Sequence, residues 1–311
     1  MQVNKAQVTL QDLQEQLAQL PLDQEEERIR IQEEIQRIKK AAYSSLTAWD
    51  QVCMARDPKR PKAMDFIGCL FDDFIELHGD RLFQDDPACQ CGLASFYGLP
   101  VTIIAQSKGK TLEENIYRNF GMLHPEGYRK AIRLAKQAEK FKRPIITFVD
   151  TAGAYPGKGA EERGQAEAIA KCLEVFSQLR VPVIAIVISE GGSGGAVAFS
   201  VADRIFMLEH AIYSILSPEG FASILWKDEK RCEEAAQLME LTSDDLYRKQ
   251  IVDQIIQEPQ EGVHTNLAEV CKQLEEAIYI ALEELLKKKD KVLLKERYEK
   301  FRRMGALYEN V

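Results

Sequence analysis

The chain lacks the cysteine spacing of a zinc protein or of a disulfide-stabilised one. Its 311 residues include seven cysteines, an odd number, and no Cys-x-x-Cys pair. Cys89 and Cys91 are too close together to form half of a usual zinc site, and no second pair complements them. We therefore expect reduced thiols, no bound metal and a cytoplasmic location.

Long apolar runs and an excess of basic residues are also missing. No run approaches the ~20 residues that a membrane span needs, and the N-terminus has no apolar signal-peptide core. The formal net charge is −8, which argues against a general nucleic-acid binder. With 45% hydrophobic and 29% charged residues, the composition is typical of a soluble protein with a large core.

Two segments of the sequence match nucleotide-binding motifs only in part. Residues 153–158 are one residue short of a phosphate loop, and Gly159 stands where Ser or Thr is required. Residues 191–195 do not continue into Gly-x-Gly-x-x-Gly, because Val197 occupies the last glycine place. We expect this chain to bind neither ATP nor NAD.

The most informative feature present is a glycine cluster that follows an apolar run. Residues 181–188 are rich in Val and Ile, which predicts a strand buried on both faces. Four of residues 191–195 are glycines, so the backbone can turn tightly and approach a ligand. The small residues from Ala196 predict a helix whose first N–H groups have no intrahelical partner. This arrangement favours negative charge, either of a bound anion or of an oxyanion formed during a reaction.

A second glycine-bearing loop, 153–159, follows another buried strand at 144–149. Loops after adjacent parallel strands meet at one edge of the sheet, where α/β proteins bind ligands. Asp150 at this strand end is either a charged group beside the site or a turn cap. Lys108, Lys110 and Lys158 either attract an anionic substrate or are ordinary surface lysines.

The N-terminal 56 residues form a separate region. Leucines at 3-4-3 spacing from Leu10 to Leu20, and isoleucines from Ile31 to Ile38, predict two amphipathic helices joined near Pro21. Their apolar stripes pack either on the chain's own domain or on a partner subunit. A polar, proline-containing linker at 56–61 marks the boundary between this hairpin, 1–56, and a main domain, 57–311.

The main domain alternates strands with helices, which predicts an α/β fold with mainly parallel strands. We expect strands at 93–97, 101–106, 144–149, 181–188, 204–208 and 212–216, and helices at 63–77, 126–140, 161–179 and from 267 onward. Residues 287–303 hold nine Lys and Arg against three Asp and Glu. This stretch is either a solvated helix face or a docking surface for an acidic partner.

Two other interpretations of the glycine cluster compete with an anion site. Gly-x-Ser-x-Gly around Ser193 matches the nucleophile elbow of serine hydrolases, with Asp203 or Asp253 as the acid and His210 or His264 as the base. None of these four residues stands in a recognisable motif. Alternatively, the glycines only allow tight packing of a helix on a strand.

The chain resembles the carboxyltransferase alpha subunits of bacterial acetyl-CoA carboxylase, which belong to the crotonase-like superfamily. The segments that carry the resemblance are 79–81 (GDR), 117–122 (YRNFGM), 124–131 (HPEGYRKA), 153–157 (GAYPG), 159–165 (GAEERGQ), 190–195 (EGGSGG), 217–220 (SPEG) and 222–227 (ASILWK). It extends from about residue 5 to residue 303. The departures are Ala152 for Pro, Ser189 for Gly, and the segments 89–91 and 261–264.

The resemblance implies a crotonase-like α/β fold of repeated ββα units with an N-terminal helical extension. It also implies transfer of CO2 from carboxybiotin, held on a separate biotin carboxyl carrier protein, to acetyl-CoA. The product would be malonyl-CoA for fatty acid synthesis. A zinc-containing beta subunit would bind acetyl-CoA in an α2β2 assembly that is required for activity, and a separate biotin carboxylase would use the ATP.

The resemblance assigns roles to glycines and to three loops. Gly194 and Gly195 would donate backbone N–H groups to the ureido oxygen of biotin as it gains negative charge, which lowers the barrier. We also expect a positive φ in this turn, which a side chain at either glycine would disturb. The expected substrate-binding residues are Gly191, Gly192, Gly153, Ala154, Tyr155, Gly157, Ser217, Pro218, Glu219 and Gly220.

Overall fold

An eight-stranded sheet forms the centre of the computed structural model, which describes residues 2–21, 24–43 and 46–306. Its strands are β1 (Asp72–Glu76), β2 (Cys89–Phe96), β3 (Leu99–Gln106), β4 (Ile145–Thr151), β5 (Val183–Gly192), β6 (Arg204–Leu208), β7 (Ile212–Ser214) and β8 (Gln254–Ile256). The order is β1-β2-β3-β4-β5-β6-β8, and β7 pairs with the end of β5. In these described ranges, no helix has the length and apolar character needed to cross a membrane.

The sheet is antiparallel at one side and parallel through the rest. Strands β1, β2 and β3 run antiparallel, and β2 and β3 are joined by a turn at Tyr97 and Gly98, both with positive φ. Strands β3, β4, β5, β6 and β8 are parallel, as the alternation of strands and helices predicts. Strands β4 and β5 are buried along their whole length, because both faces of the sheet are covered.

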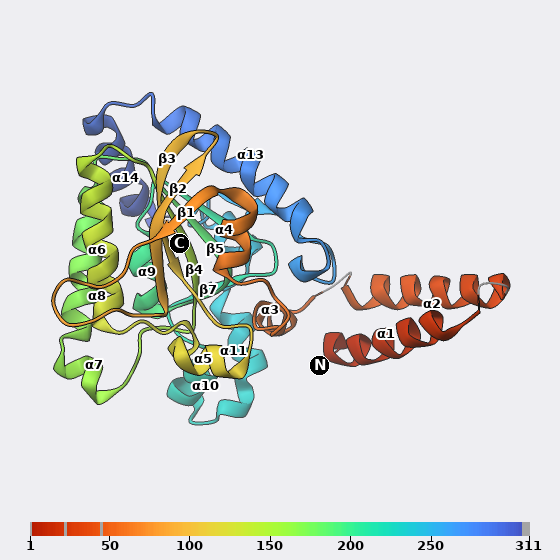
Figure 1. Ribbon diagram of the computed structural model, residues 1–311. Helices are drawn as coiled ribbons and strands as arrows, with labels where there is room; N and C mark the ends of the chain where they lie inside the picture. The colour runs from red at the N-terminus through yellow and green to blue at the C-terminus, as the bar shows by residue number, and fades with distance from the viewer. Residues whose placement is uncertain (1, 22–23, 44–45, 307–311) are drawn as a thin grey trace.

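Helices cover the sheet on two sides (Figure 1). On one side α6 (Pro125–Lys140) packs against α8 (Gln165–Gln178), and α14 (Asp290–Arg303) packs on α8. On the other side α4 (Ala63–Leu70) packs against α13 (Leu267–Leu285). The remaining helices of the main domain are α5 (Leu112–Tyr117), α7 (Lys158–Glu162), α9 (Ser193–Ser200), α10 (Pro218–Trp226), α11 (Cys232–Met239) and α12 (Ser243–Arg248).

Two predicted helices are shorter than expected. The helix expected at 63–77 ends at Leu70, and 72–76 form β1, because pairing with β2 outweighs the local helical pattern. The pairing of β1 is irregular, with a register shift after Asp72 and a left-handed Asp73. The helix expected at 161–179 is divided into α7 and α8 by Gly164, which has a φ of +83°.

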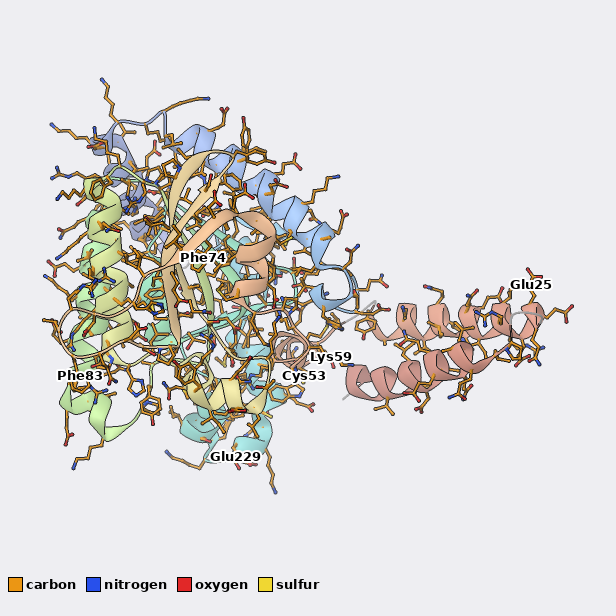
Figure 2. The ribbon with its side chains drawn as sticks, viewed as in Figure 1. Glu25, Cys53, Lys59, Phe74, Phe83 and Glu229 are labelled. Carbon is orange, nitrogen blue, oxygen red and sulfur yellow. The ribbon has the colours of Figure 1, made fainter. Side chains whose placement is uncertain are left out.

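The N-terminal hairpin extends away from the main domain (Figure 1). It consists of α1 (Gln2–Gln19) and α2 (Glu25–Tyr43), and α3 (Ala48–Ala55) connects it to the sheet. The predicted apolar stripes pack against each other, so the hairpin does not lie along its own domain. It is joined to the rest of the chain through Met54 and an ion pair between Lys39 and Glu261. Figure 2 labels Cys53 and Lys59 at this junction.

The basic C-terminal stretch is not entirely a solvated face. Arg297 of α14 is buried, and its guanidinium lies 2.7 Å from Asp203 Oδ2. The same guanidinium donates to the carbonyl oxygens of Phe176, Leu179 and Val181. Arg297 therefore fixes α14 to the segment that enters β5, which corrects the expectation for this residue.

Candidate active site

The predicted site begins inside the sheet, at the end of β5. Gly191 and Gly192 belong to the strand rather than to the turn, and they pair with β7 on one side. Gly191 also pairs with Thr151 of β4. A Cβ at position 192 would lie 2.1 Å from the carbonyl oxygen of Ala152, so only glycine fits there. These two glycines hold the ends of β4 and β5 close together.

The turn from β5 into α9 takes its positive φ from Ser193. The φ of Ser193 is +57°, whereas neither Gly194 nor Gly195 has a positive φ, which corrects the expectation that a glycine would adopt it. A serine in this conformation is strained, a common feature of functional turns. Gly195 is required for packing, since a Cβ there would lie 2.8 Å from Gly153 C and 2.9 Å from Ala154 N.

Gly194 and Gly195 lie in the first turn of α9, where backbone N–H groups have no intrahelical acceptor. The cap residue Gly192 supplies no side chain to accept from them. Outside the hydrogen bonds within helices and strands, no backbone hydrogen bond from either amide is found in the described part of the chain. The helix dipole places partial positive charge at the same point. The turn can therefore receive negative charge, as the glycine pattern predicts.

A hollow of about 740 Å³ opens beside this turn. Of the predicted residues, it is lined by Gly153, Ala154, Tyr155, Ser217 and Glu219, together with Ser193. The structure thus brings together the loop after β4, the loop before α10 and the turn after β5. Ile169 of α8 and Gln165 complete part of the wall.

The other predicted substrate-binding residues support the wall rather than line it. Gly157 lies beneath the ring of Tyr155, where a Cβ would be 2.2 Å from a ring carbon. Pro218 is the buried first residue of α10, and the Gly220 amide donates to the Ser217 hydroxyl at 3.1 Å. The ring of Tyr155 also stacks on His124, with centroids 4.2 Å apart.

Sequence reasoning missed a row of ion pairs beneath these loops. Lys108 Nζ lies 3.1 Å from Asp150 Oδ1 and 3.1 Å from Glu190 Oε2, and Arg56 pairs with Glu190 and Glu219. Lys108 is therefore not an ordinary surface lysine, and Asp150 is an ion-pair partner rather than a turn cap. The only signal in the sequence was the place of Glu190 directly before the glycines.

The ion pairs keep these groups charged. Burial alone would lower the pKa of Lys108, but the carboxylates of Asp150 and Glu190 raise it above its usual value. Burial would likewise raise the pKa of Glu190, but Lys108 and Arg56 lower it. Lys108 and Glu190 are thus both held in their charged forms at neutral pH.

The geometry gives no support to a serine hydrolase. Asp203 is bound by Arg297, and Asp253 accepts from the Ile205 amide and pairs with Lys300. Both buried ring nitrogens of His210 lack a hydrogen-bond partner among the described residues, so His210 makes no hydrogen bond to Ser193. Within the same ranges, no group of three or more His, Cys, Asp or Glu residues is arranged to hold a metal ion.

Comparison with known proteins decides the family. The family model "Acetyl co-enzyme A carboxylase carboxyltransferase-like" matches residues 1–305. Proteins named acetyl-coenzyme A carboxylase carboxyl transferase subunit alpha are similar at high identity. That of Shouchella clausii is 52% identical over 90% of this chain and 86% of its own length. That of Staphylococcus haemolyticus is 48% identical over 96% of this chain and 97% of its own length.

The chain belongs to the acetyl-CoA carboxylase carboxyltransferase alpha-subunit family. Solved structures agree with this family in their fold. Transcarboxylase 12S aligns with a TM-score of 0.61 and 21% identity, over 75% of this chain and 43% of that one. The Pseudomonas malonate decarboxylase hetero-tetramer in complex with coenzyme A aligns with a TM-score of 0.57 and 18% identity, over 71% of this chain and 88% of that one. The expected crotonase-like fold is therefore confirmed for this carboxyltransferase.

Proposed function

We propose that this carboxyltransferase alpha subunit receives carboxybiotin from a carrier protein and directs its carboxyl group to acetyl-CoA, so that malonyl-CoA is formed. The observation that carries the proposal is the pair of amides in the first turn of α9, which no side chain caps, beside a hollow built from the predicted loops. Carboxylated biotin, when bound, supplies an activated carboxyl group whose departure leaves negative charge on the ureido oxygen.

The residues of this chain fit such a group. Residue 194 has no side chain, and a Cβ there would meet only Ile169 Cγ2, at 3.6 Å, on the wall of the hollow. A flat ring can therefore approach the backbone at this point. The Gly194 and Gly195 amides stabilise negative charge more than the neutral ground state, and losing one such donor typically costs ~3–4 kcal/mol of barrier. Ser193 needs no chemical role in this scheme.

The proposal includes a second subunit that supplies the acyl-CoA side of the site. The relatives are named as subunit alpha, and the malonate decarboxylase that shares the fold is a hetero-tetramer. Apolar side chains near the hollow support a partner surface, since Ile215, Ile224 and Leu225 are all more than half exposed. We assign to this partner the zinc site and acetyl-CoA, in an α2β2 assembly. A separate carrier protein, a separate biotin carboxylase that uses ATP, and a cytoplasmic location complete the proposal.

The reaction is best tested in reverse with the assembled complex. The chain is co-purified with its partner subunit, and biotin-dependent decarboxylation of malonyl-CoA is measured, with each subunit alone as the control. We expect activity only in the complex. The Ser193→Ala complex should retain most of the decarboxylation activity. Loss of the nucleophile of a serine hydrolase would instead lower the rate about 10⁶-fold. A folded complex without any biotin-dependent decarboxylation would contradict the proposal.

A further inference from the structure

Arg56 joins two carboxylates that come from different parts of the site. It is the C-cap residue of α3, at the end of the N-terminal extension. Its Nε and Nη2 lie 2.9 and 2.8 Å from Glu190 Oε1, and its Nη1 lies 2.7 Å from Glu219 Oε1. All three residues line the hollow. The extension thus contributes a side chain to the wall of the candidate active site.

The two carboxylates belong to the strand and the helix that border the site. Glu190 lies in β5, three residues before Ser193, and Glu219 lies in the first turn of α10. The other carboxylate oxygen of Glu190, Oε2, pairs with Lys108, which also pairs with Asp150 at the end of β4. A continuous series of ion pairs therefore connects the start of α10, the end of β5 and the end of β4. Arg56 is the link between α10 and the two strands.

The backbone that carries Arg56 is firmly held. The Ser189 hydroxyl of β5 donates to the carbonyl oxygen of Ala55 at 2.7 Å, which satisfies one of the unpaired carbonyls at the end of α3. Val52 and Ala55 pack in one buried cluster with Ile212 of β7. The guanidinium is therefore placed by α3 and not by a mobile loop. Ser189 is also one of the positions at which this chain departs from the usual family residue.

We propose that Arg56 is a positioning residue for carboxyl transfer, which sets the spacing between the 217–220 loop and the amides of Gly194 and Gly195. The inference rests on the proposed function of those amides. A guanidinium suits this role because its planar array of donors can bind two carboxylates at once, whereas the ammonium group of lysine acts as a point charge. Displacement of such loops by about 1 Å can cost 10²-fold in rate.

The test uses Arg56→Met in the complete complex with the partner subunit. We expect kcat for biotin-dependent malonyl-CoA decarboxylation to fall about tenfold to hundredfold, while KM for malonyl-CoA changes less than threefold. Millimolar methylguanidinium should restore part of the lost kcat, because it can refill the space between Glu190 and Glu219. Arg56→Lys should be intermediate. Arg30→Met, at an exposed arginine of the same extension, is the matched control.

Several outcomes would overturn the inference. A kcat of Arg56→Met within twofold of the wild type would exclude a positioning role. A fall in kcat that only matches the fall in the amount of folded complex, and that methylguanidinium does not restore, would exclude it as well. If Arg56→Met does not assemble, Arg56→Lys is used, and wild-type kcat in that variant rejects the proposal. An inactive wild-type complex would instead count against the proposed function itself, so the two failures are distinguishable.

Discussion

Gly194 and Gly195, in the first turn of α9, differ in how much space surrounds them. A methyl group at Gly195 would meet backbone atoms of Gly153 and Ala154, which can only move together with their loop. A methyl group at Gly194 would make only an ordinary van der Waals contact with Ile169 Cγ2, at 3.6 Å. Gly195 is therefore fixed by packing, whereas packing leaves room for a side chain at Gly194.

Alanine at each position should separate these roles. We expect Gly195→Ala to lower the free energy of unfolding by about 1–3 kcal/mol, because overpacking forces the 153–154 loop to shift. Gly194→Ala should leave stability unchanged or raise it by up to ~1 kcal/mol, yet reduce decarboxylation in the complex. Urea unfolding measures the stability of the two variants, and the decarboxylation assay measures their activity. Equal stability losses in both variants would contradict the packing argument.

Asp86 provides a pH-dependent test at a single residue. Burial raises the pKa of this carboxyl from its usual 3.8 to about 6, although it accepts hydrogen bonds from the amides of Ala88 and His124. Because the folded state favours the protonated form, the stabilising contribution is complete below pH 3.8 and is lost as pH rises through 6. Relative to Asp86→Asn, the wild-type free energy of unfolding should fall by up to about 3 kcal/mol between pH 4 and pH 7. Parallel curves for the two proteins would contradict this.

At the scale of elements, α14 depends on one buried side chain. Arg297 binds Asp203 and three carbonyl oxygens at the entry to β5, and Asp203 in turn accepts from the Val183 amide. Removing the cation would leave a buried carboxylate without its partner, which is more costly than losing both charges.

Arg297→Met should therefore lower the free energy of unfolding by about 3–5 kcal/mol. The double variant with Asp203→Asn should recover part of that loss, since no buried charge remains unpaired. Arg302→Met, at an exposed residue of the same helix, should change stability by less than about 0.5 kcal/mol. Denaturant unfolding of the wild type, Arg297→Met, Asp203→Asn and the double variant measures the coupling, with Arg302→Met as the control. An Arg297→Met variant as stable as Arg302→Met would refute the assigned role of the ion pair.

The sequence predicted elements best where local pattern and burial agree. The apolar runs that became β4 and β5, the exact strand 204–208 and the amphipathic helix α6 were all recognisable. Strand β1 was not, because its residues are largely polar and it forms only by pairing with β2. The break at Gly164 and the left-handed Ser193 depend on tertiary packing, which no local pattern encodes.

The backbone turn and loop of the candidate site could be predicted from the sequence, whereas the ion pairs beside them could not. Repeated glycines next to buried strands indicated the turn and the facing loop, because those features are local. The ion pairs of Arg56 and Lys108 join residues 134 and 82 positions apart in the chain, so apart from the place of Glu190 before the glycines the sequence offered no sign of them. Arg56 in particular was interpreted as part of a polar linker.

At the scale of the whole molecule, the hairpin of α1 and α2 is nearly independent of the sheet. Among the hairpin side chains that the structure describes, Leu10, Ile35 and Tyr43 are buried, and they form a cluster with Met54 apart from the main core. The main domain therefore does not rely on the hairpin for its own packing.

A chain that lacks residues 2–43 should still fold. We expect its Tm to fall by less than about 4 °C, because the deletion removes the packing of the hairpin cluster on Met54 and the ion pair between Lys39 and Glu261 but leaves the main core intact. Thermal unfolding followed by circular dichroism, with the full chain as the control, measures this. Complete loss of the cooperative transition would contradict the independence of the two parts.

The irregular strand β1 has a consequence for how such chains associate. It forms one end of the sheet order and carries Asp72, Asp73 and Glu76, while the short β8 forms the other end. The carboxylates and the distorted backbone of β1 make it unfavourable for a strand of another molecule to pair with this edge. At the other edge, β8 has only three residues with which such a strand could pair. Association of copies of this chain by extension of the sheet is thereby disfavoured.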